Sequence, residues 1–240
     1  MPDARIDRQL SIVVPAFNEE RRIGASLEKL LDYGKRRLAG FEIIVVDDGS
    51  SDRTCALVDE RARGEPRLQL VRLPHNRGKG AAVRRGMLEA RLAHALFTDA
   101  DLSTPIEDVE LLFAALGEAQ VAIGSRALAG SRIEVRQPFY REWMGRGFNL
   151  LVQRAALPGI HDSQCGFKLF EIAAARELFA LARLDGFAFD VEVLFLCRKL
   201  GIRVAEVPVR WRNDQASRVK PVRDALRMAR DLALIRAVHR

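Results

Sequence analysis

Two carboxylates one residue apart, Asp99 and Asp101, are the clearest candidates for chemistry in this 240-residue chain. They follow a short apolar run, 95–97, that predicts a buried strand, so they lie just past the carboxyl end of that strand. Ligands bind at this edge of open α/β sheets. Two aspartates at this spacing can hold Mg²⁺ or Mn²⁺ and leave coordination positions for the phosphates of a nucleotide. The pair alone is a weak motif, because most such aspartates are loop or cap residues.

The residues after this pair predict the start of a helix. Thr104 and Glu107 have the spacing of a capping box, and Pro105 is expected at the first helical position. The helix is expected to cover residues 106–116, which places the two aspartates in the loop between a strand and a helix.

The two earlier predicted strands, 10–14 and 41–46, are each followed by a candidate segment. The candidate residues are Pro15, Asn18 and Glu19 after the first strand, and Asp47 and Asp48 after the second. Carboxylates at the end of a strand can accept hydrogen bonds from ribose hydroxyls or from the N–H of a base. The alternative is a local role in turns and helix caps, with Asp52 as the cap of a helix over 54–63.

A glycine-rich basic turn, 76–80, follows a third predicted strand over 68–73. Backbone N–H groups at a helix start, together with Lys79, favour a cradle for a diphosphate, although the turn lacks the Lys-Ser/Thr of a P-loop. A helix over 81–92 is expected next. A further strand over 121–123 leads to Arg126.

Strands and helices alternate up to residue 125. This order is typical of an α/β fold with a mostly parallel central sheet and helices on both faces. The second half is less regular: the stretch 161–168 is expected to be a loop, a helix that Asp190 would cap is expected to end near residue 200, and a last strand is expected over 203–209.

Arginine and aromatic residues are concentrated in the segment 132–146. A solvated charged face would account for them, but Arg136 and Arg141 also favour an anion-binding segment. The C-terminal residues 217–240 have apolar residues near helical spacing and arginines on the other side. This pattern predicts a basic amphipathic helix, which either packs on the domain or lies on lipid.

The formal net charge of +7 favours anionic partners, either phosphates or an anionic membrane surface. Three widely separated cysteines argue against a disulfide framework and fit a reducing cytosol. The first eight residues are too charged for a signal peptide. No apolar run approaches the roughly 20 residues of a membrane span. Any membrane contact is therefore expected to be peripheral, at the cytoplasmic face.

Five motifs together resemble glycosyltransferase family 2, which has the GT-A fold. They are Val14–Glu20, Val45–Ser50, Asn76–Gly80, Asp99–Asp101 and Gly124–Arg126. Their order and spacing are those of the family. In the second half, Asp162–Phe170 and Phe187–Glu192 resemble the dolichyl-phosphate β-glucosyltransferase branch of polyprenyl-phosphate glycosyltransferases.

The resemblance implies roles for individual residues. Those that would bind the nucleotide-sugar are Pro15, Asn18, Glu19, Asp47, Asp48, Lys79 and Asp99. Asp99 and Asp101 would hold Mg²⁺ or Mn²⁺. Arg126 would face the acceptor phosphate, for which Arg136 and Arg141 are further candidates. Asp190 matches the carboxylate that serves as base in relatives with hydroxyl acceptors, so the candidate catalytic residues are Asp99, Arg126 and Asp190.

The expected reaction is the inverting transfer of a hexose from a nucleotide-sugar to a polyprenyl phosphate. UDP-glucose is the first choice of donor and GDP-mannose the second. The alternatives are a GDP-mannose-dependent mannosyltransferase and a family 2 enzyme with a saccharide acceptor. Nucleic acid is not expected as a partner, because carboxylates at strand ends repel phosphate. Residues 1–216 are expected to form the GT-A catalytic domain and residues 217–240 the C-terminal helix.

Overall fold

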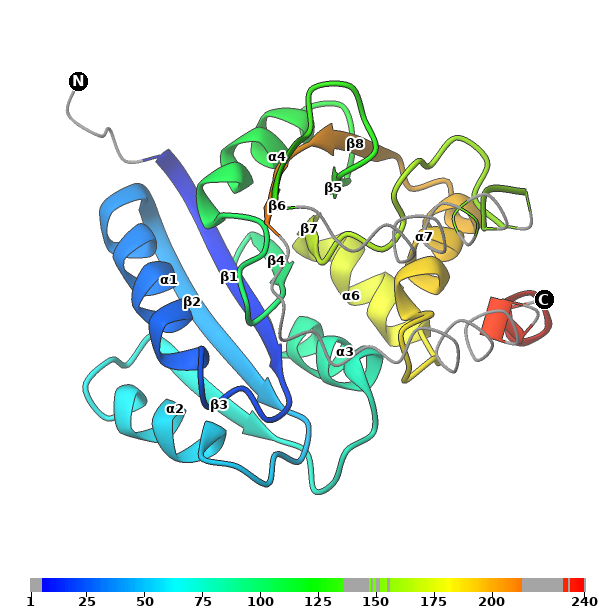
Figure 1. The fold of residues 1–240 in the computed structure, drawn as a ribbon. Coiled ribbons are helices and arrows are strands. Elements are labelled where there is room, and N and C mark those ends of the chain that lie inside the picture. Colours follow the sequence, from blue (N-terminus) through cyan, green and yellow to red (C-terminus); the bar gives the residue numbers. More distant parts are fainter. Residues whose placement is uncertain are drawn as a thin grey trace.

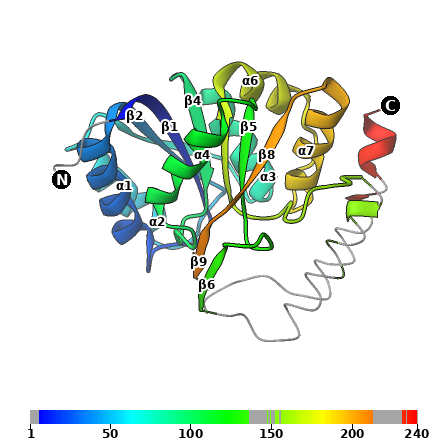
Figure 2. The ribbon, with the colours of Figure 1, turned by 90° about the horizontal axis from the view of Figure 1, so that it is seen from above.

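The computed structural model describes residues 6–135, 147, 149, 152–154, 156–212, 231–232 and 234–239. A seven-stranded sheet with helices on both faces forms its centre (Figures 1 and 2). Its strands, in chain order, are β1 (Ile6–Ala16), β2 (Leu38–Asp47), β3 (Leu68–Arg72), β4 (His94–Thr98), β5 (Val121–Ser125), β7 (Phe167–Glu171) and β8 (Val204–Pro208). The helices are α1 (Ile23–Arg37), α2 (Thr54–Ala62), α3 (Lys79–Glu89), the 3₁₀ helix η1 (Ile106–Asp108), α4 (Val109–Ala115), α6 (Ile172–Leu181) and α7 (Phe189–Leu200).

The strand order is β3-β2-β1-β4-β7-β5-β8. Six strands run in the same direction, and only β7 is antiparallel to its neighbours β4 and β5. The expectation of an α/β fold with a mostly parallel sheet is therefore confirmed. A separate pair of short parallel strands, β6 (Arg132–Val135) and β9 (Arg210–Arg212), lies beside this sheet.

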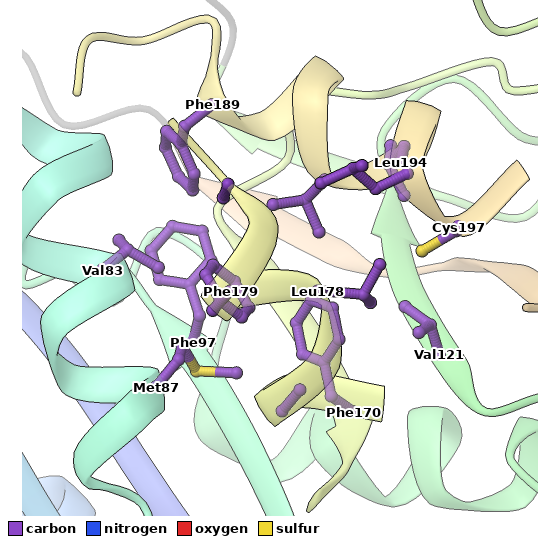
Figure 3. Close-up of a cluster of buried hydrophobic side chains, with 14 of the residues drawn as sticks. Val83, Met87, Phe97, Val121, Phe170, Leu178, Phe179, Phe189, Leu194 and Cys197 are labelled. Atoms are coloured by element: carbon purple, nitrogen blue, oxygen red, sulfur yellow. The ribbon is translucent and has the colours of Figure 1, made fainter. Parts of the chain in front are cut away.

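Alternate residues of each strand point into two different cores, as the pleat of a strand requires. In β4, Ala95 and Phe97 join the core under α3, α6 and α7, and Leu96 joins the core under α1 and α4. Figure 3 shows the first of these cores, in which Phe97, Phe179 and Phe189 lie close together. Phe97 and Phe189 meet edge to face, with ring centroids 5.6 Å apart.

Four expectations about local structure are wrong. Strand β7 begins at Phe167, inside the stretch 161–168 that was expected to be a loop, because apolar residues flank Lys168 in the run Phe167–Phe170. The capping box is absent: Pro105 has an extended ψ of 141° and precedes a 3₁₀ turn that no side chain caps. Asp190 lies in the first turn of α7, and the residue at the cap is Ala188.

The fourth concerns Asp52. It accepts a 2.9 Å hydrogen bond from the N–H of Thr54, but Arg53 occupies the cap position of α2.

Some expectations fall on residues outside the described ranges. Arg136 and Arg141 are among them, as is most of the segment 217–240. Within that segment the structure describes helical residues at 231–232 and 234–238. Leu232 and Ile235 there are buried in the core that contains α7. Over the described part of the chain, no helix is long and apolar enough to cross a membrane.

Candidate active site

The side chains that the sequence singled out lie along one edge of the sheet. The carboxyl ends of the six parallel strands share this edge, and β1 and β2 point to it in Figure 1. Because β7 is antiparallel, its amino end lies there too, which brings the residues before Phe167 beside Asp99. The site therefore combines residues from both halves of the chain.

Asp99 follows β4 directly and is fixed from two sides. Its backbone N–H donates to the carbonyl of Gly166 at 3.2 Å, and its Oδ1 accepts a 2.6 Å hydrogen bond from Lys79 Nζ. A Cβ at position 166 would lie only 2.1 Å from Asp99 Oδ2. A side chain at 166 would therefore displace this carboxylate from its present position.

Asp101 lies beside Asp99 with its carboxylate held by the loop. Its Oδ1 accepts a 2.9 Å hydrogen bond from the N–H of Ser103, and its Oδ2 is 4.0 Å from Arg22 Nη1. Burial raises the pKa of Asp101, and the negative charge of Asp99 raises it further. A cation placed at these two carboxylates would relieve this repulsion.

Lys79 is the first residue of α3, and Asp48 builds the turn in front of it. The two oxygens of Asp48 accept 2.8 Å hydrogen bonds from the N–H groups of Arg77 and Gly78. Gly78 has a φ of 119°, which favours glycine, and a Cβ there would lie 2.4 Å from the carbonyl oxygen of Asp185. The buried Asp48 thus positions the lysine that reaches Asp99.

Hydrogen bonds connect the loop after β1 with the loop after β2. Asp47 Oδ2 accepts hydrogen bonds from the N–H groups of Gly49 (3.1 Å) and Ser50 (3.0 Å), while its buried Oδ1 has no hydrogen-bond partner within the described residues. Asn18, in a left-handed conformation with a φ of 56°, accepts a 2.8 Å bond from the N–H of Ser51. The structure therefore brings the first and second loops together.

Glu19 and Pro15 complete the same loop pair. The N–H of Glu19 donates to Thr54 Oγ1 at 2.7 Å, and its carboxylate forms an ion pair with Arg22. Pro15 lies within β1, opposite Val46 of β2. Glu19 thus joins the loop after β1 to the first residue of α2, whereas Pro15 belongs to the sheet itself.

Arg126 follows β5 and is bound to Asp162, a residue that was not singled out as a site residue. Arg126 Nε and Nη2 reach the two carboxylate oxygens at 2.7 and 2.9 Å. The guanidinium also lies 5.4 Å from the ring centroid of Trp211. Burial alone would raise the pKa of Asp162, but Arg126 outweighs it and keeps the pKa below its ordinary value. The arginine thus reaches the site edge in a fixed orientation.

Asp190 and Lys168 form a buried ion pair at the inner end of the site. Lys168 Nζ also donates to the carbonyl of Cys165 at 2.6 Å. Burial raises the pKa of Asp190 above its ordinary value, although the ammonium groups of Lys168 and Lys79 act in the opposite direction. Sequence reasoning missed Lys168, although a charged residue inside the apolar run Phe167–Phe170 was a signal that could have found it.

Comparison with known proteins agrees with this geometry. Residues 11–179 match the family model Glycosyl transferase family 2. The dolichyl-phosphate β-glucosyltransferase of Drosophila melanogaster is 40% identical over 95% of this chain and 74% of its own length. The human dolichyl-phosphate β-glucosyltransferase is 36% identical over 95% of this chain and 75% of its own length.

Solved structures give the same fold. Mannosyl-3-phosphoglycerate synthase from Rubrobacter xylanophilus superposes with a TM-score of 0.69 at 17% identity, covering 96% of this chain and 73% of that one. Glucosyl-3-phosphoglycerate synthase from Mycobacterium tuberculosis, in complex with Mn²⁺ and UDP-glucose, gives a TM-score of 0.63 at 22% identity, covering 95% and 77%. The fold and the family that the motifs predicted are thereby confirmed: the chain belongs to glycosyl transferase family 2, in the group of the dolichyl-phosphate β-glucosyltransferases.

Proposed function

We propose that this glycosyltransferase moves glucose from UDP-glucose to a dolichyl or other polyprenyl phosphate, with inversion at the anomeric carbon. The observation that carries the proposal is the similarity to dolichyl-phosphate β-glucosyltransferases along 95% of the chain. GDP-mannose is the second candidate donor.

The proposed donor site is built around Asp99 and Lys79. The first turn of α3 and the ammonium of Lys79 suit the diphosphate, because a helix start and a cation both favour negative charge. The loop pair formed by Asn18 and the residues after Asp47 would enclose the nucleoside. Here Asp48 contributes indirectly, since both of its oxygens are already bonded to the turn before α3.

A divalent ion, Mg²⁺ or Mn²⁺, fits the pair Asp99 and Asp101. Both carboxylates are partly exposed at the strand end, and Gly166 leaves the space that Asp99 occupies. Over the described residues, no cluster of three or more Asp, Glu, His or Cys side chains could hold a metal. Two protein ligands with the remaining positions left to phosphate and water suit an ion that arrives with the nucleotide. Such an ion would neutralise charge that develops on the departing diphosphate.

The reaction needs no proton transfer when the acceptor is a phosphate. An acceptor oxygen that is already anionic forms the new bond to the anomeric carbon. The bond from that carbon to the β-phosphate oxygen breaks, and its electron pair leaves with UDP. We propose that Arg126 faces the acceptor phosphate, together with Arg136 and Arg141 from outside the described residues.

We further propose peripheral contact with an anionic membrane surface at the cytoplasmic face. The basic residues of the C-terminal segment support it, among them Lys220, Arg223, Arg227 and Arg230. Each such residue near an anionic surface contributes about 1 kcal/mol. Leu232 and Ile235 are packed against the domain, so they are not available to lipid in this arrangement.

A family 2 enzyme with a saccharide acceptor is the second candidate. It would require a carboxylate that accepts a proton from a hydroxyl, and Asp190 holds that position. The buried ion pair between Asp190 and Lys168 disfavours this alternative.

The test is a transfer assay with UDP-glucose or GDP-mannose as donor and farnesyl phosphate or a simple saccharide as acceptor. We expect a β-linked glucosyl phosphate from UDP-glucose and farnesyl phosphate. Preferential transfer from GDP-mannose, or to the saccharide, would contradict the proposal.

A further inference from the structure

Lys168 is a charged residue on a strand face whose neighbours are apolar. It lies in the middle of β7, opposite Phe97 of β4 and Ile123 of β5. Its neighbours in β7, Phe167 and Leu169, belong to the other core, so Lys168 is on the face covered by α3, α6 and α7. Only 1% of the residue is exposed.

A buried ammonium is costly unless it is paired and hydrogen-bonded. Lys168 has an ion pair with Asp190, which is 3% exposed, and a 2.6 Å hydrogen bond to the carbonyl of Cys165. Its Nζ also lies 5.7 Å from the centroid of the Phe97 ring. Lys168 thus connects three parts of the site: the sheet, the loop before β7 and the first turn of α7.

Charged groups of alternating sign lead from the partly exposed Asp99 to the buried Lys168. The charged groups that face Asp190 are Lys168 from β7, Lys79 from α3 and Asp99 from the end of β4. Lys79 is bonded to Asp99 at 2.6 Å and lies 5.2 Å from the same Phe97 ring. Asp190 therefore has two ammonium groups near it, and they offset part of the rise in its pKa that burial causes.

We propose that Lys168 is a positioning residue that keeps Asp190 in a buried ion pair, so that Asp190 does not act as a general base and the site favours an acceptor that is already anionic. This inference rests on the proposed function and adds a reason for its specificity. The predicted consequence is low hydrolysis of the nucleotide-sugar, since water is an acceptor that must lose a proton.

The two competing reactions differ in that proton. In transfer to a phosphate, the acceptor oxygen bonds to the anomeric carbon and UDP leaves with the electron pair of the broken bond. In hydrolysis, the oxygen of water forms the new bond, UDP leaves in the same way, and a base removes the proton from the attacking water. General-base catalysis accelerates such a step by about 10²–10⁴-fold.

The experiment compares Lys168→Gln, which removes the charge but keeps a donor, with Lys168→Arg, which keeps the charge. For each variant and the wild type, UDP-glucose hydrolysis and transfer to farnesyl phosphate are measured separately at neutral pH. We expect the ratio of hydrolysis to transfer to rise about tenfold or more in Lys168→Gln. In Lys168→Arg we expect it to stay near that of the wild type.

The double variant Lys168→Gln/Asp190→Asn shows whether the gain comes from Asp190. We expect hydrolysis to fall back once the carboxylate is gone. An unchanged ratio in Lys168→Gln, or raised hydrolysis that persists in the double variant, would overturn the proposal. Lys168→Met is a second variant without the charge if Lys168→Gln does not fold.

Lys35→Met is the matched control. It removes an ammonium that lies 2.7 Å from the buried Glu65, away from the site edge. We expect it to leave the ratio unchanged. Hydrolysis of UDP-glucose needs no lipid acceptor, so it tests the role of Lys168 separately from the proposed acceptor. If the wild type fails to transfer to farnesyl phosphate but hydrolysis responds to Lys168→Gln, the proposed acceptor is wrong and the role of Lys168 stands.

Discussion

Asp162 receives three hydrogen bonds from Arg126: from Nε at 2.7 Å, from Nη2 at 2.9 Å and from the backbone N–H at 2.9 Å. Asp162 is itself placed by Glu206, whose Oε1 accepts its N–H at 2.7 Å. The orientation of Arg126 therefore depends on residues that lie far from it in the sequence.

Asp162→Asn should loosen Arg126 and destabilise the fold. Hydrogen bonds to charged groups contribute about 1.5–3 kcal/mol, so we expect a loss of about 2 kcal/mol in the free energy of unfolding. The Michaelis constant for farnesyl phosphate should rise more than that for UDP-glucose. Denaturant unfolding and steady-state kinetics test both. Asp59→Asn, at an exposed ion pair with Arg72, is the control and should change stability little.

Asp99→Asn and Asp101→Asn should each abolish transfer without unfolding the protein, because each removes a charged carboxylate of the proposed metal site at a partly exposed strand end. A chelator should do the same to the intact protein. Electron paramagnetic resonance of Mn²⁺ measures binding directly. Full activity in excess chelator would show that the metal assignment is wrong.

Lys79→Gln should have opposite effects on two ligands. Lys79 is a cation bonded to Asp99, so its removal should strengthen Mn²⁺ binding in the absence of nucleotide. An ion pair of this exposure contributes up to about 1 kcal/mol, or roughly a fivefold change in affinity. UDP should bind more weakly, because a cation beside its diphosphate is lost. Weaker binding of Mn²⁺ alone would contradict the observed pairing.

Binding measurements can identify the nucleobase of the sugar donor directly. Calorimetry with UDP and with GDP in the presence of Mn²⁺ should show tighter binding of UDP. Tighter binding of GDP would favour the mannosyltransferase alternative.

Glu65 should contribute to stability at acidic pH. Hydrogen bonds from Arg67 are the main cause that lowers its pKa from 4.5 to about 2. Ionised Glu65 therefore stabilises the fold above pH 4.5, and this contribution disappears as the pH falls towards about 2. Glu65→Gln should make the loss of stability over this range shallower. Denaturant unfolding at several pH values measures it, and an unchanged slope would contradict the assignment.

Membrane contact should depend on charge in the C-terminal segment. Replacing Arg223, Arg227 and Arg230 by Gln should weaken sedimentation with anionic vesicles, mostly at low salt, and leave UDP-glucose hydrolysis intact. Substitution is preferable to deletion, because Leu232 and Ile235 are part of the core. Binding equal to that of the wild type would leave the segment 132–146 as the contact.

The sequence predicted the first half of the fold well. Its strands have continuous apolar runs, and helices with clear apolar faces separate them, so local pattern and tertiary structure agree. The second half was harder, because β7 contains a lysine and is antiparallel, and its pairing with β4 and β5 depends on distant residues.

The site residues from the first half of the chain were likewise easier to predict than those from the second half. Motifs marked Asp99, Lys79 and Arg126, since each follows a predicted strand or begins a helix. Their partners Gly166 and Asp162 come from a segment expected to be a loop, and only the fold brings them together. Asp48 shows the opposite case: its position was predicted, but its two bonds to the turn before α3 were not.

The place of β7 between β4 and β5 also has a consequence for biosynthesis. A nascent chain that ends before residue 167 has made β4 and β5 but not the strand that joins them, so each keeps an unpaired edge. Unpaired edges are templates for aggregation, and pairings between distant segments form slowly. The ribosome must therefore deliver the chain beyond residue 167 before the centre of the sheet can close, and until then the edges of β4 and β5 stay open to incorrect pairings.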